Sequence, residues 1–247
     1  MIFFVGLDDT GKTGQTGTGE LALALGLRLQ SLGLVRLLHI SMHQLLAPCE
    51  DLPGCSLNQA YCLTLDGDAT RLREIELESR VYVNRNFQAG SNPGLALARQ
   101  DQVSERLFTF AKACRLMPML RSDARERARE NDITLTAFSG DGQGTIGALA
   151  AIGWRWQGSD GTVTCMPGLA DLKGVMTLTG VLQHCTFDLV KTIRGKTPFF
   201  DDRIQLGEGV SPLLKNGRTL LLLEASARNA DWEWTAIGPE NASRMTW

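Results

Sequence analysis

The chain has 247 residues, of which 43% are hydrophobic and 21% are charged, and its net charge is −2. This composition supplies a packed core and excludes a disordered chain, and the length allows one large domain or two small ones. With 25 basic and 27 acidic residues, the chain lacks the basic excess that nucleic-acid-binding proteins usually carry. We therefore do not expect nucleic acid as a partner.

The six cysteines, at positions 49, 55, 62, 114, 165 and 185, show no C-x-x-C spacing, so a zinc ribbon is not expected. The start of the chain has no positively charged segment ahead of an apolar one, and no apolar stretch approaches the length of a membrane span. These features predict a reduced, cytoplasmic protein without a membrane partner, in which the cysteines are small core residues.

The first half of the chain mixes strand and helix patterns. Apolar runs bounded by turn residues predict strands, and apolar residues at helical spacing predict helices. In the segment 20–32 leucine alternates, but leucine and alanine are strong helix formers and β-branched residues are missing, so we expect a buried helix. The expected strands are 2–5, 35–46, 59–65 and 95–97, and the expected helices are 20–32, 68–87, 101–117 (capped by Asp101) and 120–130.

The second half follows a candidate boundary at Asn131-Asp132. Strands and helices mixed at this spacing indicate an α+β fold with α/β-like layers. We expect a strand over 133–138, a short helix over 145–152, a hairpin over 154–166, and strands over 219–223 and 232–237.

The most informative stretch is a glycine-rich loop after the first strand. Gly6 ends the apolar run, two adjacent carboxylates follow at Asp8 and Asp9, and glycines recur from Gly11 to Gly19. Glycines let backbone N–H groups approach an anion, and the N-terminus of a following helix adds positive potential. Carboxylates can hold Mg²⁺, whose other ligands are waters and phosphate oxygens. The stretch is therefore suited to binding a metal and phosphates.

Residues 6–13 also satisfy the P-loop pattern G-x-x-x-x-G-K-[ST]. A P-loop helix begins directly after the lysine, whereas Gly14, Gly17 and Gly19 postpone the helix here. Two carboxylates inside the cradle would also repel phosphate unless a cation lay between them. The alternative without chemistry is a flexible glycine turn capped by Asp8.

Residues 142–147 match G-x-G-x-x-G, after an expected strand and before an expected helix. A dinucleotide fold would need an acidic residue about 20 positions later, at the end of a following strand, where we instead expect the return strand of a hairpin. Two interpretations stay open, tight packing of a small-residue helix on its strand or contact with a ligand. An NAD-dependent oxidoreductase is a further hypothesis that requires dinucleotide binding here.

His39 and His43 lie four residues apart on an expected strand, so they face the same side. They could bind a metal, or they could be buried histidines with satisfied hydrogen bonds, which is the commoner case. We expect at least one of them to be structural.

Five blocks of the sequence together resemble one family. The blocks are GLDDTGKTGQTGTGELA at 6–22, HQLL at 43–46, NQA at 58–60, GSNPGLAL at 90–97 and GQGTIGALAAIG at 142–153. The set resembles the N-terminal half of the archaeal agmatidine synthetases, which use ATP to attach agmatine to a cytidine of an isoleucine tRNA. It looks closer still to the short, stand-alone relatives of that family. The similarity spans roughly residues 1–155.

The resemblance implies a kinase-like domain that binds Mg²⁺ and ATP over residues 1–131 and a ferredoxin-like domain over residues 132–247. In the synthetases an aspartate-rich loop binds metal and phosphates, and a threonine just beyond it takes part in phosphoryl transfer. Carried over here, Asp8 and Asp9 are metal ligands, and these two residues together with Thr18 are the catalytic residues.

Two departures from the family matter. Gly11 stands where the synthetase loop carries a further aspartate, and Lys12 follows it, so either Mg²⁺ affinity falls or Lys12 takes over charge neutralisation. In addition, the 247 residues carry no zinc ribbon and leave little room for the OB-fold domain that binds nucleic acid in the full-length enzymes. We therefore do not carry over tRNA as the substrate.

The sequence leads to the hypothesis of a Mg²⁺- and ATP-dependent transferase or ligase that acts on an unidentified small molecule. The alternative, which Gly11 favours, is a module that binds a nucleotide or small ligand without turnover. The sequence also allows a homodimer. The residues expected to bind the nucleotide or substrate are Thr10, Gly11, Lys12, Thr13, Gly17, Gly19, Asn58, Ser91, Asn92, Gly94, Gly142, Gly144 and Gly147.

Overall fold

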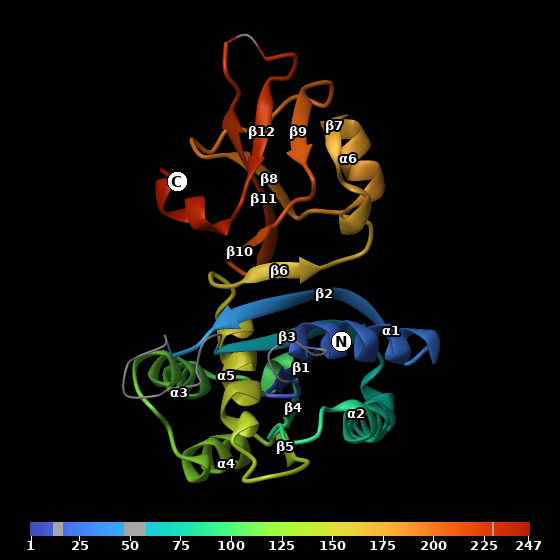
Figure 1. Cartoon of the computed structure of the whole chain (residues 1–247), viewed down its shortest axis with the longest axis vertical. Helices are drawn as coiled ribbons and strands as arrows, with labels where there is room; N and C mark the ends of the chain where they lie inside the picture. Colours follow the sequence, from blue (N-terminus) through green and yellow to red (C-terminus); the bar gives the residue numbers. More distant parts are fainter. Residues whose placement is uncertain (12–16, 47–57, 229) are drawn as a thin grey trace. The chain divides into compact units, whose positions relative to one another are not determined.

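The computed structural model describes residues 1–11, 17–46, 58–228 and 230–247. The chain divides into two compact units, Met1–Gln157 and Gly158–Trp247 (Figure 1). Each unit mixes strands and helices, which confirms the expected α+β class. In the described part of the chain, no helix has both the length and the apolar character that crossing a membrane requires.

The first unit is built on an antiparallel sheet with the strand order β5-β4-β1-β3-β2. Helices α1 and α2 pack on one face of this sheet, and α3, α4 and α5 pack on the other (Figure 1). The strands are β1 (Ile2–Asp8), β2 (Val35–Gln44), β3 (Gln59–Gly67), β4 (Gly94–Arg99) and β5 (Thr134–Ala137), and the helices are α1 (Thr18–Ser31), α2 (Leu72–Asn86), α3 (Glu105–Leu116), α4 (Arg121–Glu130) and α5 (Gly144–Gln157), with short 3₁₀ turns η1 (Ala69–Arg71) and η2 (Gln100–Gln102).

Strand β1 lies at the centre of this sheet and continues past the glycine that was expected to end it. Side chains alternate between the two faces of a strand, and Phe4 packs in the core beneath α5, so Gly6 and Asp8 face α5 as well. A Cβ atom on Gly6 would collide with the backbone of Ala148 in α5. Gly6 therefore allows α5 to pack closely on β1, and the strand continues through Gly6 to Asp8.

Helix α1 confirms the expectation of a helix over 20–32. Its buried leucines, Leu21, Leu25 and Leu29, are spaced by four residues, while Leu27 stays 51% exposed. A helix has a stripe with this spacing, whereas a strand would have placed all five leucines, which stand at every second residue, on one face. Helix propensity was thus a better guide than the alternation of leucine.

Two local expectations are wrong. Ser104, not Asp101, caps α3, because Ser104 Oγ accepts a hydrogen bond of 3.4 Å from Leu107 N, and Asp101 lies in η2. The hairpin expected over 154–166 is not formed, since α5 runs on through Gln157. Trp154 explains this extension, because its indole Nε1 donates to Ala111 O of α3 at 3.1 Å and fixes another helical turn in the core.

The compact units divide after Gln157, later than the boundary expected at Asn131-Asp132. Strand β5 pairs with β4, and α5 packs on the face of β1, so residues 134–157 belong to the first unit. The assignment of a kinase-like domain to 1–131 and a ferredoxin-like domain to 132–247 stays a prediction.

The second unit has the strand order β6-β10-β11-β12-β9-β7, and β8 pairs with β11 in parallel. The expected strands at 219–223 and 232–237 are confirmed as β11 and β12, and the four consecutive leucines of β11 are buried. The elements are β6 (Thr162–Cys165), β7 (Gly174–Thr177), β8 (Leu189–Thr192), β9 (Arg203–Gly207), β10 (Leu213–Lys215), β11 (Arg218–Ala225), β12 (Trp234–Ile237), α6 (Leu178–His184), η3 (Leu169–Asp171) and η4 (Pro239–Arg244).

Candidate functional site

The last residue of β1, Asp8, lies against the first turn of α5. A Cβ atom on Gly147 would collide with the carboxylate of Asp8, and one on Gly144 would lie 2.8 Å from Asp8 O and 2.5 Å from Asn92 O. Glycine at 144 and 147 therefore allows α5 to begin directly beside the acid. Because the N-terminus of a helix carries positive potential, this position favours an anion or a carboxylate.

Asp9 turns the chain away from the strand. Its φ of 51° lies in the left-handed region, which is uncommon for residues other than glycine, asparagine and aspartate. Asp9 N donates to Asp8 Oδ1 at 2.7 Å, and Asp9 Oδ2 accepts from Asn92 N at 3.2 Å. These bonds fix the backbone of Asp9 against the carboxylate of Asp8, and the carboxylate of Asp9 against the backbone of Asn92.

Thr10 links the acid pair to the start of α1. Thr10 N donates to Thr18 Oγ1 at 3.2 Å, and Thr10 O accepts from Gln88 N at 2.9 Å. The hydroxyl of Thr10 is buried and has no hydrogen-bond partner among the described residues. Buried polar atoms nearly always have a partner, so this orphaned hydroxyl marks the site as incomplete.

Asn92 ties the turn at 91–94 to the loop that precedes α5. Its carbonyl oxygen accepts from Gly144 N at 3.0 Å, and its side-chain Oδ1 accepts from Asp141 N at 3.4 Å. Ser91 O accepts from the hydroxyl of Ser139 at 2.8 Å. The turn and the loop therefore meet beside Asp9.

The electrostatic environment of Asp8 is one that a bound cation would make more favourable for the charged carboxylate. Burial and, next, the negative charge of Asp9 raise the pKa of Asp8 to about 8, although the hydrogen bond from the backbone of Asp9 opposes the shift. Within the described residues no ion pair involves Asp8, and no group of three or more His, Cys, Asp or Glu side chains could hold a metal. A divalent ion here would thus take two protein carboxylates and complete its shell with water or phosphate oxygens, as Mg²⁺ commonly does.

The structure brings most of the expected site residues together at the end of β1. Two, Lys12 and Thr13, lie outside the described residues. Gly19 is a packing position, because a Cβ there would lie 2.8 Å from the ring of Tyr61, and Asn58 O accepts from Leu45 N and Gln44 Nε2 beside the β2–β3 pairing. Those that surround the acid pair or lie beside it in the chain are Thr10, Gly11, Gly17, Thr18, Ser91, Asn92, Gly94, Gly142, Gly144 and Gly147.

Three further residues at this site were not singled out from the sequence. Gln88 N donates to the carbonyl oxygen of Thr10, and the hydroxyl of Ser139 donates to Ser91 O in the turn at 91–94. Asp141 Oδ1 accepts from Gln143 N at 3.0 Å within the loop before α5. The only signal for Ser139 and Asp141 was their place in the glycine-rich loop SGDGQG. No sequence signal indicated Gln88.

The sheet argues against two of the nucleotide folds that the motifs allowed. Both neighbours of β1 are antiparallel to it, whereas P-loop and dinucleotide-binding folds use parallel strands. Strand β5, which precedes the G-x-G-x-x-G match, is antiparallel to β4. Gly144 and Gly147 allow the close approach of α5 to the turn at 91–94 and to Asp8, and ligand contact at Gly142, Gly144 and Gly147 stays a prediction.

His39 and His43 belong to a separate, buried cluster. His39 Nε2 accepts from Arg155 Nε at 3.0 Å, and the hydroxyl of Ser41 lies 2.9 Å from His43 Nε2. Burial, together with the charges of Arg155 and His43, lowers the pKa of His39 to about 3. His39 is thus a neutral, partnered core residue, and His43 is buried within hydrogen-bond distance of Ser41, in agreement with the structural interpretation.

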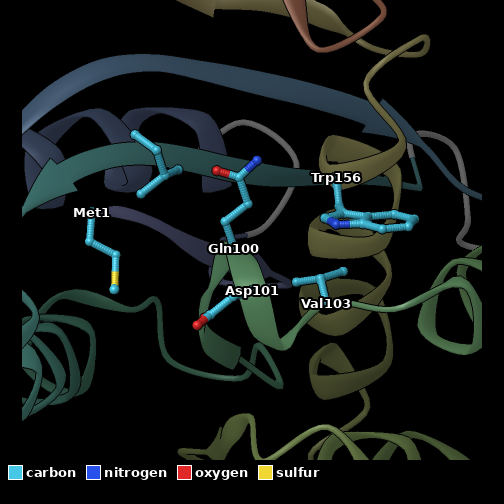
Figure 2. A pocket seen from close by; sticks show the side chains of 6 residues that line it. Met1, Gln100, Asp101, Val103 and Trp156 are labelled. Carbon is cyan, nitrogen blue, oxygen red and sulfur yellow. The ribbon is translucent and has the colours of Figure 1, made fainter.

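A cavity of about 480 Å³ opens at the other end of β1 (Figure 2). It lies between Met1 and Trp156, with Gln100 and Asp101 at its rim. A strand rises about 3.3 Å per residue, so most of the length of β1 separates this cavity from Asp8. None of the expected site residues lines it.

Comparison with known proteins gives a fold but no family. No family model matches the sequence, and no curated protein matches it significantly. Among solved structures the chain is similar to apo TiaS, a tRNAIle2 agmatidine synthetase, with a TM-score of 0.51 and 22% identity. The aligned part covers 62% of this chain and 35% of that one.

Two further solved structures are similar to the same extent. The complex of TiaS with tRNA(Ile2), AMPCPP and agmatine has a TM-score of 0.53 at 21% identity, and a tRNA fluorescent labeling enzyme has 0.53 at 22%. Each alignment covers 62% of this chain and 36% of the other, so the chain spans about a third of their length. At this identity the likeness shows that about three fifths of the chain shares the fold of the agmatidine synthetase structures.

Proposed function

We propose that this chain binds Mg²⁺ and ATP at the end of β1 and transfers a phosphoryl group, or forms a bond at the expense of ATP, on a small-molecule substrate. The observation that carries the proposal is the acid pair Asp8-Asp9, set against the glycine-cleared start of α5 and beside the orphaned hydroxyl of Thr10. The fold shared with TiaS, one of whose structures is a complex with tRNA(Ile2), AMPCPP and agmatine, supports the same conclusion.

The residues at the site have distinct roles in this proposal. Asp8 and Asp9 would hold the metal, which when bound supplies positive charge that neutralises the phosphates. A bound metal ion would lower the raised pKa of Asp8, because a nearby cation favours the charged form of a carboxyl group and offsets the repulsion from Asp9. The hydroxyl of Thr10 would gain the partner that it lacks among the described residues.

The start of α1 would face the phosphates. Its N-cap is Gly17, which supplies no side-chain cap for the first N–H groups of the helix, and uncapped N–H groups are suited to binding an anion. Thr18 Oγ1 accepts from Thr10 N, so its hydroxyl lies on the side of the acid pair. In the proposed reaction Thr18 contacts or accepts the γ-phosphoryl group, and catalysis consists of positioning and charge neutralisation.

A binding module without turnover is the second candidate. Gly11 favours it, because a carboxylate expected from the resemblance is absent at that position. Both candidates predict Mg²⁺-dependent nucleotide binding at Asp8 and Asp9, and only the enzyme predicts loss of the γ-phosphate. A small-molecule substrate, the absence of nucleic acid, a homodimer and a cytoplasmic location stay predictions.

Thermal unfolding with and without Mg²⁺-ATP tests the site. We expect the wild-type protein to gain stability with the ligand and Asp8→Asn to lose that gain, since saturation at roughly 100 times Kd contributes about 2.7 kcal/mol. The matched control is Asp101→Asn, which removes a carboxylate from the other end of the sheet and should keep the full gain. An unchanged gain in Asp8→Asn would overturn the metal assignment.

A second pair of variants distinguishes a loss of ligand binding at the acid pair from a general loss of stability. Gly147→Ala places a methyl group on the carboxylate of Asp8, whereas Gly153→Ala crowds Ala111 at 2.7 Å on the same helix, away from the acid pair. Both should unfold more easily, but only Gly147→Ala should lose Mg²⁺-ATP binding. Labelled ATP then distinguishes the enzyme, which releases or transfers the γ-phosphate, from the binding module.

A further inference from the structure

The second unit contains a cavity of its own, of about 320 Å³, whose lining is basic. Three cations line it, Arg194, Lys196 and Arg244, and the single carboxylate is Glu224. Arg244 Nη2 already donates to Glu224 Oε2 at 2.6 Å. The lining therefore carries two positive charges that no lining carboxylate balances.

The two remaining cations come from one rigid turn. Thr192 closes this turn, because its N donates to Lys196 O at 2.8 Å and its Oγ1 accepts from Lys196 N at 3.1 Å. Gly195, with a φ of 77°, allows the reversal, and Ile193 N donates to Leu223 O of β11 at 2.9 Å. Arg194 is thereby held on an anchored segment next to the cavity.

Arg194 and Lys196 are free to bind a ligand. In the described part of the chain their side chains form no hydrogen bond and no ion pair. Arg194 and Lys196 line the same small cavity, so their like charges repel one another. A bound anion would offset this repulsion, and guanidinium groups match the geometry of phosphate oxygens.

The lining of the cavity also includes an aromatic side chain. Trp234 lines it, and its indole Nε1 donates to Asp202 Oδ2 at 2.7 Å, so the ring is fixed in orientation. Ile193 and Ala225 add apolar surface. A fixed indole next to cations suits a planar ring that carries an anionic group.

From these features we propose that the second unit binds a small phosphate ester with a planar ring, of the size of a nucleoside monophosphate. Arg194 and Lys196 contact the phosphate, and Trp234 contacts the ring. The volume of the cavity favours a small ligand, because 320 Å³ is near the lower end of the usual range of ligand pockets, roughly 300–1,000 Å³. This site is independent of the metal and nucleotide site proposed at Asp8.

Calorimetric titration of the full chain with AMP tests the proposal. EDTA in the buffer suppresses Mg²⁺-dependent binding at Asp8. We expect one AMP per chain, and at least a roughly tenfold loss of affinity in the double variant Arg194→Ala/Lys196→Ala, since hydrogen bonds to charged groups are stronger than neutral ones. Adenosine, which lacks the phosphate, should bind at least about tenfold more weakly than AMP.

The matched control removes two charges from elsewhere in the same unit. Lys173→Ala/Arg218→Ala alters two exposed cations that do not line the cavity, and it should bind AMP within about twofold of wild type. Asp8→Asn should also bind AMP normally, so failure at either site is distinguishable from failure at the other. Both double variants must unfold at the wild-type temperature for the comparison to count.

Three results would overturn the proposal. The first is an absence of AMP binding to the wild-type protein, and the second is an equal loss in both double variants, which would indicate a general charge effect. The third is tight binding of a single-stranded oligonucleotide that AMP does not displace, which would assign these cations to nucleic acid instead.

Discussion

The first unit contains two polar clusters that differ in how fully their hydrogen bonds are satisfied. In the histidine cluster, Arg155 Nε reaches both His39 Nε2, at 3.0 Å, and Thr64 Oγ1, at 2.8 Å. In the acid pair, Asp8 has a raised pKa and the neighbouring hydroxyl of Thr10 has no partner among the described residues.

This difference separates a structural from a functional use of buried polar groups. A cluster whose members satisfy one another contributes to stability and needs no ligand. In the acid pair, burial and the neighbouring carboxylate raise the pKa of Asp8, and the hydroxyl of Thr10 lacks a partner among the described residues, so a bound cation would favour the charged form of Asp8. The acid pair is therefore the candidate site, although histidine is the commoner metal ligand.

The largest expected effect comes from opening the histidine cluster. Arg155→Met keeps much of the side-chain volume but removes the donor to His39 and Thr64. Leaving these two buried acceptors unpaired should lower the free energy of unfolding by about 2–4 kcal/mol, measured by urea denaturation at neutral pH.

The control for this variant is Arg115→Met, in which a less buried arginine loses its bond to Gln44 O and its contact with the ring of Trp154. It should cost about 1 kcal/mol. If Arg155→Met were no worse than this control, the histidine cluster would not be held by Arg155, and the contrast with the acid pair would fail.

An intermediate effect is expected from the pH dependence of the metal-free protein. The pKa of Asp8 is about 8 in the folded state and about 4 in the unfolded chain, so the folded state binds this proton more tightly. The resulting stabilisation is fully present below about pH 4 and is lost as the pH rises through about 8. Asp8→Asn is neutral throughout and should lack this loss.

Urea denaturation in EDTA at pH 5 and pH 8.5 measures the effect. Asp8→Asn should gain about 2 kcal/mol relative to wild type across this interval, a value reduced from the full shift because part of the residue is accessible to water. Asp101→Asn should follow the wild-type protein. Parallel curves for wild type and Asp8→Asn would mean that Asp8 is ionised at pH 5 and that the pair is already compensated.

The smallest effect compares one hydroxyl from each cluster. Ser41→Ala removes a hydroxyl that lies 2.9 Å from His43 Nε2 and should cost about 1 kcal/mol. Thr10→Val removes the orphaned hydroxyl and keeps the shape, so metal-free stability should stay the same or rise by up to about 1 kcal/mol. Equal losses in the two variants would show that Thr10 has a partner after all.

The sequence was enough to predict which residue types form the candidate site, but it predicted their spatial arrangement only in part. Asp8, Asp9 and Thr18 are close in sequence, so local patterns were enough to single them out. The contribution of Asn92 and Gly147 rested on family resemblance, because residues more than eighty positions apart meet only through the sheet and α5. Gln88 gave no signal, since it acts through its backbone N–H.

By itself the sequence determined the local elements, because helix propensity, turn residues and apolar periodicity act over a few neighbouring positions. It therefore predicted α1, β2 and β3 nearly in full and the centre of β11. The tertiary structure alone decided that β1 continues through Gly6, that α5 extends to Gln157, and that residues 134–157 complete the first unit. These outcomes depend on close contact between distant backbones, such as Gly6 with Ala148, and no local pattern records such a contact.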